Sequence, residues 1–143
     1  MGKPIQTLTV RDVADRPATV RAVFDTGSHF TIVRESCLPA GAQVLKYAKP
    51  KDMRTATQGG PLSITGATQL VIEIGDKQVQ DEVLVAPQLG QEMLVGAGTM
   101  QKWDISIQNE NGHTRVVVGK DLRDPDITEV DGCGCGTLEG PTE

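Results

Sequence analysis

The chain has 143 residues, of which 38% are hydrophobic but only 3% aromatic, with 16 glycines and a net charge of −5. This length fits one domain whose core consists mainly of Val, Ile, Leu and Ala, a composition that favours short strands and turns over long helices. The excess of acidic residues lies entirely from Lys120 onward, and the charge-balanced first 119 residues give no reason to expect a nucleic-acid partner.

The lack of a signal-peptide pattern and the positions of the cysteines indicate a reducing compartment. The N-terminus lacks the pattern of a signal peptide, and no apolar run reaches the ~18 residues that a membrane span needs. The three cysteines do not suggest a disulfide framework, and Cys133 and Cys135 alone are too few ligands for zinc. We therefore expect a cytoplasmic protein with no membrane partner, no metal and no cofactor.

The first third of the chain predicts three strands around one unusual turn. Apolar and β-branched residues indicate strands over residues 5–10, 18–24 and 30–34. Between the second and third strands lies Asp25-Thr26-Gly27-Ser28. These are ordinary turn residues, but an aspartate between apolar strands is costly to bury unless hydrogen bonds or a chemical role keep it there. These residues alone leave both a simple corner and a chemical site open.

The middle of the chain predicts a basic mobile stretch over residues 46–51, followed by a hairpin. The hairpin has arms over residues 53–57 and 62–66 and a tip at Gln58-Gly59-Gly60-Pro61. Threonine and small residues dominate its arms, with few large apolar anchors. We therefore expect this hairpin to stand away from the core and to move.

A longer hairpin follows, with clean alternation over residues 68–74, a turn at Gly75-Asp76 and a return strand over residues 79–86. One face of this hairpin should be buried, because alternate residues of a strand point to opposite sides.

The last part of the chain predicts a strand, a single short helix and two further strands. The apolar residues 93–95 meet Gly96, after which Thr99, Met100 and Trp103 recur at helical spacing. Strand patterns resume over residues 105–107 and 116–118. Trp103 is better explained as a core anchor than as a platform for a ligand.

The order and spacing of three parts resemble a retropepsin-type aspartic protease over roughly residues 5–119. The parts are the turn at Asp25, the glycine-tipped hairpin, and Leu94-Val95-Gly96 before a short helix. They resemble most the proteases of retroelement polyproteins, and next the retroviral-like domain of ubiquitin-shuttle proteins. The resemblance implies an all-β fold: a closed barrel that is half of an acid protease, with a flap hairpin and one short C-terminal helix. Residues 1–119 would form this domain, and residues 120–143 an acidic, flexible tail.

Catalysis of this kind needs two carboxyl groups, one as base toward water and one as proton donor. The chain has one Asp-Thr-Gly turn, so we expect a homodimer in which two Asp25 side chains share a proton. The resemblance implies that Thr26 ties the two turns together and that Gly27 accepts substrate backbone. Ser28 can donate to the Asp25 carboxylate.

A polypeptide substrate would lie as an added strand between the turns and the flaps. Apolar side chains near the turn and on the hairpin predict hydrophobic residues on both sides of the scissile bond. The candidates for substrate and flap contacts are Phe30, Ile32, Val33, Gln58, Gly59, Gly60, Pro61, Leu62 and Ile64, with Leu94, Val95 and Gly96 as a supporting loop.

Two positions depart from the family. Retroviral members usually carry Asp two residues after the turn and Arg after the apolar-apolar-Gly element, and these form a pair; here the residues are His29 and Ala97. Because both partners are replaced, no unpaired buried charge remains. The alternatives for the dimer interface are that it is weak, that it depends on pH through His29, or that it is built from other contacts. Gly98 and Thr99 also soften the helix.

Two functions therefore remain open. The first is an active endopeptidase that processes a retroelement polyprotein, including itself, with the exposed tail as a cleavage site. The second is a catalytically weak or inactive module for dimerisation or peptide binding on the same fold.

Overall fold

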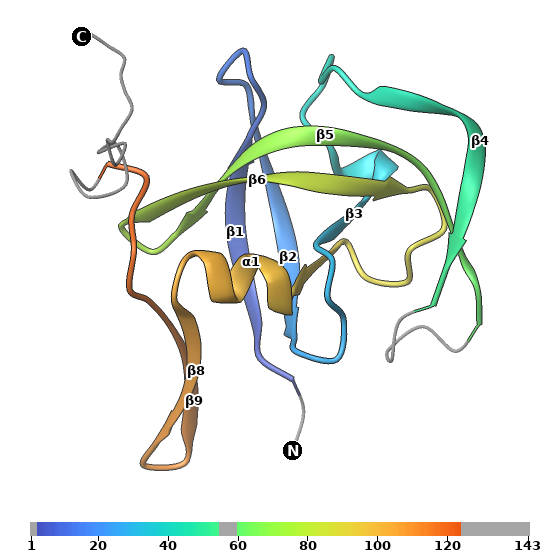
Figure 1. The fold of residues 1–143 in the computed structure, drawn as a ribbon. Helices are drawn as coiled ribbons and strands as arrows, with labels where there is room; N and C mark the ends of the chain where they lie inside the picture. Colours follow the sequence, from blue (N-terminus) through green and yellow to red (C-terminus); the bar gives the residue numbers. More distant parts are fainter. Residues whose placement is uncertain (1–2, 55–59, 124–143) are drawn as a thin grey trace, which may run out of the picture.

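The computed structural model describes residues 3–54 and 60–123. Over these residues the chain forms nine strands, one 3-10 turn and one short α-helix (Figure 1). In chain order the elements are β1 (Ile5–Arg11), β2 (Pro17–Asp25), β3 (Ile32–Arg34), η1 (Glu35–Cys37), β4 (Leu45–Met53), β5 (Leu62–Ile74), β6 (Lys77–Ala86), β7 (Met93–Gly96), α1 (Ala97–Lys102), β8 (Ile105–Glu110) and β9 (His113–Val118). None of the helices in this part of the chain is long and apolar enough to cross a membrane.

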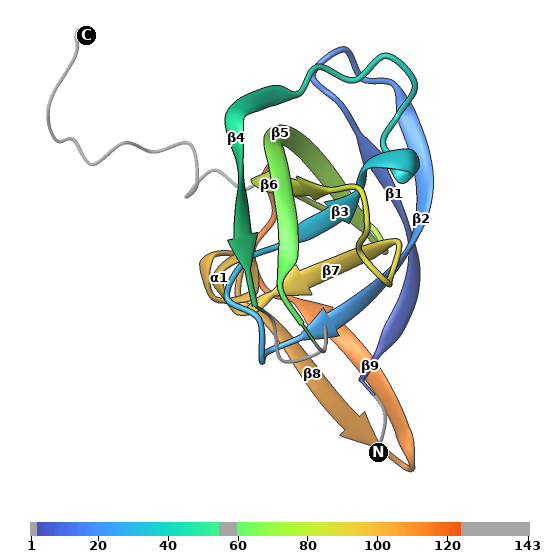
Figure 2. The same cartoon turned by 90° about the vertical axis from the view of Figure 1, so that its right-hand side faces the viewer.

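Six of the described strands close into a barrel (Figures 1 and 2). The strand order is β1-β2-β7-β3-β6-β5, and residues 9–11 of β1 pair again with residues 71–73 of β5 to close the ring. β4 is added at the edge beside β5, and β8 and β9 form a hairpin of their own. The predicted all-β fold, a closed barrel with one short helix, is confirmed.

The barrel interior is filled by aliphatic and β-branched side chains. Val10, Val20 and Ile72 are fully buried and belong to the same cluster as Trp103. Trp103 is 4% exposed, and its Nε1 donates to the carbonyl oxygen of Gln80 at 3.2 Å. Its predicted role as a core anchor is confirmed, because it fastens the end of α1 to β6.

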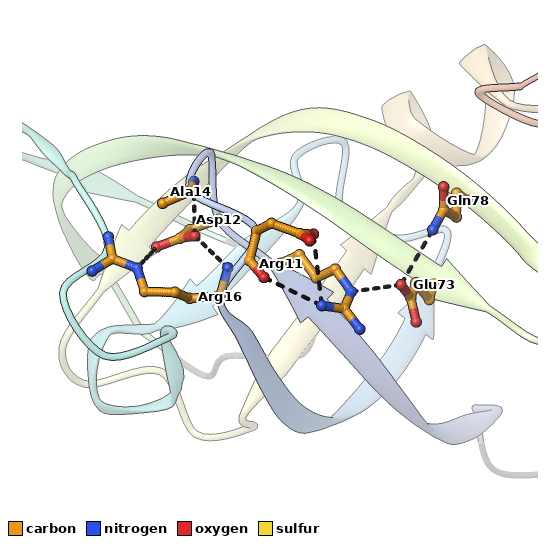
Figure 3. Close-up of polar contacts among 7 residues, drawn as sticks. Arg11, Asp12, Ala14, Arg16, Glu73 and Gln78 are labelled. Atoms are coloured by element: carbon orange, nitrogen blue, oxygen red, sulfur yellow. Dashed lines mark hydrogen bonds and ion pairs between the residues drawn. The ribbon is translucent and has the colours of Figure 1, made fainter.

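Polar contacts fasten the barrel where β1 meets β5 (Figure 3). Arg11 Nε donates to Glu73 Oε2 at 2.7 Å, and Gln78 Nε2 donates to the same oxygen at 3.2 Å. The hydrogen bond from Arg11 lowers the pKa of Glu73. In the adjoining turn, Asp12 accepts from the backbone amide and the Nε of Arg16, both at 2.8 Å. These contacts lie at the start of β2, so they fix the barrel at the end opposite to Asp25.

The predicted long hairpin is confirmed as β5 and β6, which pair continuously from Gly66–Val85 to Ile74–Lys77. The buried face is the predicted one, because Leu70 and Ile72 are at most 1% exposed. Strict alternation made this the clearest element to predict.

The prediction of a mobile stretch over residues 46–51 is wrong. These residues belong to β4, which pairs with β5 from Leu45–Ala67 to Met53–Leu62, with a register shift between Lys46 and Lys51. Nearly all side chains of β4 are exposed, so the strand has no apolar alternation that would reveal it. The strand is held by backbone pairing to β5, which no local residue pattern encodes.

The second arm of the first predicted hairpin is the start of β5. Of the first arm, residues 53–57, Met53 ends β4 and residues 55–57 lie outside the described residues. Gln58 and Gly59, half of its predicted tip, lie outside the described residues. The expectation that the hairpin stands away from the core is wrong for its second arm, because Leu62 and Ile64 are each 1% exposed. These two side chains form a second apolar cluster with Ile32, Ala86 and Leu89.

The first four residues of the predicted tail, 120–123, pack onto the barrel; residues 124–143 lie outside the described part. The Leu122 amide donates to the Gln78 carbonyl at 2.6 Å, and the Arg123 guanidinium donates to the Asp76 carbonyl at 2.7 Å. Asp121 is 5% exposed and accepts from the backbone amide and the guanidinium of Arg123, both at 3.0 Å. The packed part of the chain therefore continues beyond Gly119, because carbonyl groups of the β5–β6 hairpin supply partners for these residues.

We predict that Asp121→Asn lowers the melting temperature at neutral pH. Hydrogen bonds from the side chain and backbone of Arg123 lower the pKa of Asp121 from 3.8 to about 2. A lowered pKa in the folded state means that the stabilisation is complete above the ordinary value and is lost as the pH falls toward 2. Thermal melts of both proteins should therefore differ at pH 7 and converge near pH 2.

The matched control is Asp52→Asn, which removes the same charge from the exposed strand β4. Its melting temperature should follow that of the native protein at every pH. An Asp121→Asn protein that melts like the native one at pH 7 would show that the ionised Asp121 carboxylate does not stabilise the folded chain.

Candidate active site

Asp25 is the last residue of β2. After it the chain leaves the barrel wall in a turn and returns to it as β3. β2 runs parallel to β7 with Asp25 opposite Gly96, and after the turn β3 runs antiparallel to β7 on its other side. All four residues of β7 are buried. The predicted supporting residues Leu94, Val95 and Gly96 therefore lie between the two strands that begin and end the turn.

Gly96 allows the turn to approach β7 closely. A Cβ atom at this position would meet the backbone of Phe30 and would lie 2.7 Å from the carbonyl oxygen of Ser28. Neither neighbour is a flexible side chain that could move aside. Any larger residue at position 96 would displace the turn that carries Asp25.

The first backbone amides of α1 hold the far side of the turn. The Ala97 amide donates to the Ser28 carbonyl at 2.6 Å, and the Gly98 amide donates to the His29 carbonyl at 2.8 Å. A Cβ at position 98 would lie 2.9 Å from the same His29 oxygen. His29 and Ala97 thus take part in holding the turn through main-chain hydrogen bonds.

The Asp25 carboxylate is buried although the turn itself is open. The side chain is 1% exposed, whereas Thr26 and Gly27 are exposed. Its Oδ1 accepts from the Gly27 amide at 2.8 Å, and the Nζ of Lys3 lies 4.0 Å from the same oxygen. The carboxylate is therefore oriented by its own turn and faces a positive charge from the N-terminal segment.

The expectation that Ser28 donates to the carboxylate is wrong. Its Oγ donates to the Phe30 carbonyl at 2.9 Å, and its backbone amide donates to the Asp25 carbonyl at 3.2 Å. A hydroxyl has one proton to donate, and here that proton stabilises the turn. Ser28, which is 3% exposed, is consequently a structural residue.

A chain of buried hydroxyl groups connects β7 to a carboxylate on β6. An ionised carboxylate only accepts, so the Thr99 hydroxyl donates to Asp81 Oδ2 at 2.6 Å. The Thr99 oxygen then accepts from the Thr31 hydroxyl at 2.6 Å, and the Thr31 oxygen accepts from the Gly96 amide at 3.0 Å. Lys102 Nζ lies 3.9 Å from the outer oxygen of Asp81. These hydrogen bonds hold the residue before β3 and the first turn of α1 against β7, the strand beside Asp25.

Reasoning from the sequence missed the roles of Lys3, Thr31 and Asp81. Each acts across a long sequence separation, as in the Thr31–Thr99 contact. Only Lys3 had a usable signal, because an antiparallel pairing of the two predicted strands in the correct register would have placed it opposite Asp25.

The predicted substrate-contact residues divide into two groups. Ile32, Leu62 and Ile64 are buried against one another in the second apolar cluster, as Val33 is in the main one. Phe30 is 47% exposed and packs edge-on against the His29 ring. Gly60 and Pro61 lie at the described edge of the hairpin tip, and they are not fully buried. A role for any of these residues toward substrate stays a prediction.

A hollow of about 520 Å³ adjoins the exposed side of the turn and is lined by Thr26, Ala97, Met100, Gln101, Asp104 and Ile105. Beside it the β8–β9 hairpin projects from the barrel (Figures 1 and 2). Within the described residues this hairpin pairs with no other strand, and most side chains of β8 are exposed. Two-stranded sheets of this kind are marginal alone and leave backbone groups available for pairing.

Residues 3–54 and 60–123 contain no set of side chains placed to bind a metal ion. No group of three or more His, Cys, Asp or Glu side chains is placed there to hold an ion. Cys37 is a half-buried free thiol, and Cys133 and Cys135 lie outside the described residues.

Similarity to known proteins was found among solved structures. No family model matches the sequence, and no curated protein matches it. Among solved structures, the chain is similar to the EIAV protease complexed with the inhibitor HBY-793, with a TM-score of 0.49 and 16% identity. The alignment covers 70% of this chain and 86% of that one.

We predict that Thr99→Val destabilises the protein by about 1–3 kcal/mol, since it leaves the buried Thr31 hydroxyl without its acceptor and removes a donor from the half-buried Asp81 carboxylate. Chemical denaturation measures this free energy of unfolding. The control is Thr114→Val, because Thr114 is exposed although its hydroxyl donates to Asn109 at 2.6 Å; it should change stability by less than about 0.5 kcal/mol. Equal effects of the two substitutions would contradict a structural role for the buried chain of hydroxyl groups.

Proposed function

We propose that the chain is an aspartic endopeptidase that acts as a homodimer on extended polypeptide substrates. The observation that carries the proposal is the Asp25 carboxylate, 1% exposed at the end of a strand and oriented by the Gly27 amide at 2.8 Å. Burial of a carboxylate is unfavourable, and the turn itself does not require one, since other residues form such turns equally well. A catalytic role explains why the acid stands at this position.

One protomer supplies one half of the chemistry. With two Asp25 side chains facing each other, like charges prevent both from ionising, and the pair shares one proton. The ionised carboxylate takes a proton from a water molecule, and the oxygen of that water attacks the peptide carbonyl carbon. The protonated carboxyl gives its proton to the carbonyl oxygen. Breakdown of the tetrahedral intermediate then transfers a proton to the leaving nitrogen as the C–N bond breaks.

The surface around Thr26 suits a second copy of the chain. Thr26 is exposed beside the hollow that α1 and the start of β8 line. A two-fold axis next to this residue would bring the two turns together and place each subunit against the hollow of the other. The unpaired edges of the β8–β9 hairpin offer backbone groups that the partner can extend into a larger sheet.

Substrate would enter between the paired turns and the two β4–β5 hairpins, which act as flaps. Phe30, which is 47% exposed and follows the turn, is available to contact an apolar substrate side chain. We expect preference for hydrophobic residues around the scissile bond, and we propose a retroelement polyprotein, including the chain's own C-terminal segment, as substrate.

The alternative is a dimerisation or peptide-binding module without activity, suggested by His29 and Ala97. The hydrogen bonds from the amides of Ala97 and Gly98 favour the catalytic proposal, because the turn remains fixed without the charged pair of the retroviral enzymes.

A peptide-library digest by native protein and by Asp25→Asn separates the two functions. The native protein should cleave between hydrophobic residues, a statine-type transition-state analogue should inhibit it, and Asp25→Asn should lower the rate by roughly 10²–10⁴-fold. Sedimentation should show both proteins as dimers. Equal cleavage by both proteins, or none by a dimeric native protein, would contradict the proposed activity.

A further inference from the structure

We propose that Lys3 is the counter-charge that allows two Asp25 carboxylates to approach each other, and hence a positioning residue for the paired site. The inference rests on the proposed homodimer and adds to it a residue from the segment before β1. Its basis is the place that the sheet register gives to Lys3.

The pairing of β1 with β2 sets this place. Ile5 lies opposite Val23, and one residue further out the Phe24 amide donates to the Pro4 carbonyl at 3.0 Å. Proline has no amide hydrogen to return the second hydrogen bond of this pair. The next opposed pair is then Lys3 and Asp25, in the non-hydrogen-bonded position where side chains on one face lie closest.

The side-chain geometry agrees with this register. The Nζ of Lys3 lies 4.0 Å from Asp25 Oδ1. The Lys3 side chain is 48% exposed whereas that of Asp25 is 1% exposed. Only the carboxylate is therefore withdrawn from water, and the ammonium can approach it while it stays partly hydrated, which avoids most of the desolvation cost of a buried ion pair.

Charge balance explains why a dimer would need this contact. The proposed pair of Asp25 side chains shares one proton and so holds one negative charge in a water-poor site, where solvent screens charges little. The Lys3 ammonium groups of the two subunits offset this charge. Lys3 therefore favours association while Asp25 supplies a negative charge, and it has no such effect when Asp25 is replaced by asparagine.

Two further titratable groups border the same corner. His29 belongs to the turn, with its ring beside Gly98, and Asp104, at the end of α1, lines the hollow with Thr26. His29→Gln and Asp104→Asn variants accompany the experiment below, so that the contributions of these side chains to dimer affinity are measured separately.

The test is a double-mutant cycle on self-association, measured by sedimentation at pH 7 for the native protein, Lys3→Met, Asp25→Asn and the double variant. Lys3→Met should raise the dimer dissociation constant about tenfold, which corresponds to about 1.4 kcal/mol. In the Asp25→Asn background the same substitution should change it less than about twofold, because no carboxylate charge remains to be balanced. Lys3→Arg should retain native affinity, because it keeps the positive charge.

Lys77→Met is the matched control. Lys77 is the first residue of β6 and lies beside the part of β5 that pairs with the end of β1, whereas Lys3 precedes the start of β1. It should leave the dissociation constant unchanged. The inference is overturned if Lys3→Met dimerises as tightly as the native protein, or if its effect is equal in both backgrounds. Monomers at every concentration would overturn the homodimer as well, whereas a charge-coupled dimer that cleaves no peptide would overturn only the catalytic proposal.

Discussion

The insertion of β7 between β2 and β3 is the constraint on which the rest of the site depends. Because β7 is parallel to one strand and antiparallel to the other, the connecting turn must pass over its end. Gly96 permits the close approach, and the first amides of α1 take the carbonyl groups of the turn. The position of Asp25 thus follows from main-chain geometry, which substitutions on the surface would change little.

Hydrogen bonds and one ion pair hold the polar groups around the turn that carries Asp25. Hydroxyl groups of Thr31 and Thr99 carry a directed series of hydrogen bonds from the Gly96 amide to Asp81. The one carboxylate of the turn faces an ammonium group at 4.0 Å. Main-chain and hydroxyl donors thus hold the turn at positions 29 and 97, where the chain carries His and Ala.

Elements with strong periodic patterns were predictable, and contacts between distant segments were not. The β5–β6 hairpin and the burial of Trp103 follow from alternation and helical spacing. β4 escaped prediction because an exposed edge strand has no apolar face, and the packing of Leu62 and Ile64 escaped because their partners lie far along the chain. Within the site, the Asp25 turn and its support on β7 were identified from residue types. The Ser28 hydrogen bond and the contact with Lys3 depended on local geometry and register that residue types do not specify.

The central claim is that each chain carries half of an active site, and a subunit-mixing experiment tests it most directly. Native protein at fixed concentration is unfolded and refolded with increasing amounts of Asp25→Asn protein, so that mixed dimers form, and peptide cleavage is measured. The account predicts that activity per native chain falls toward the level of the variant alone as mixed dimers replace native ones. Activity per native chain that stays constant in a large excess of the variant would contradict it, because each chain would then be complete by itself.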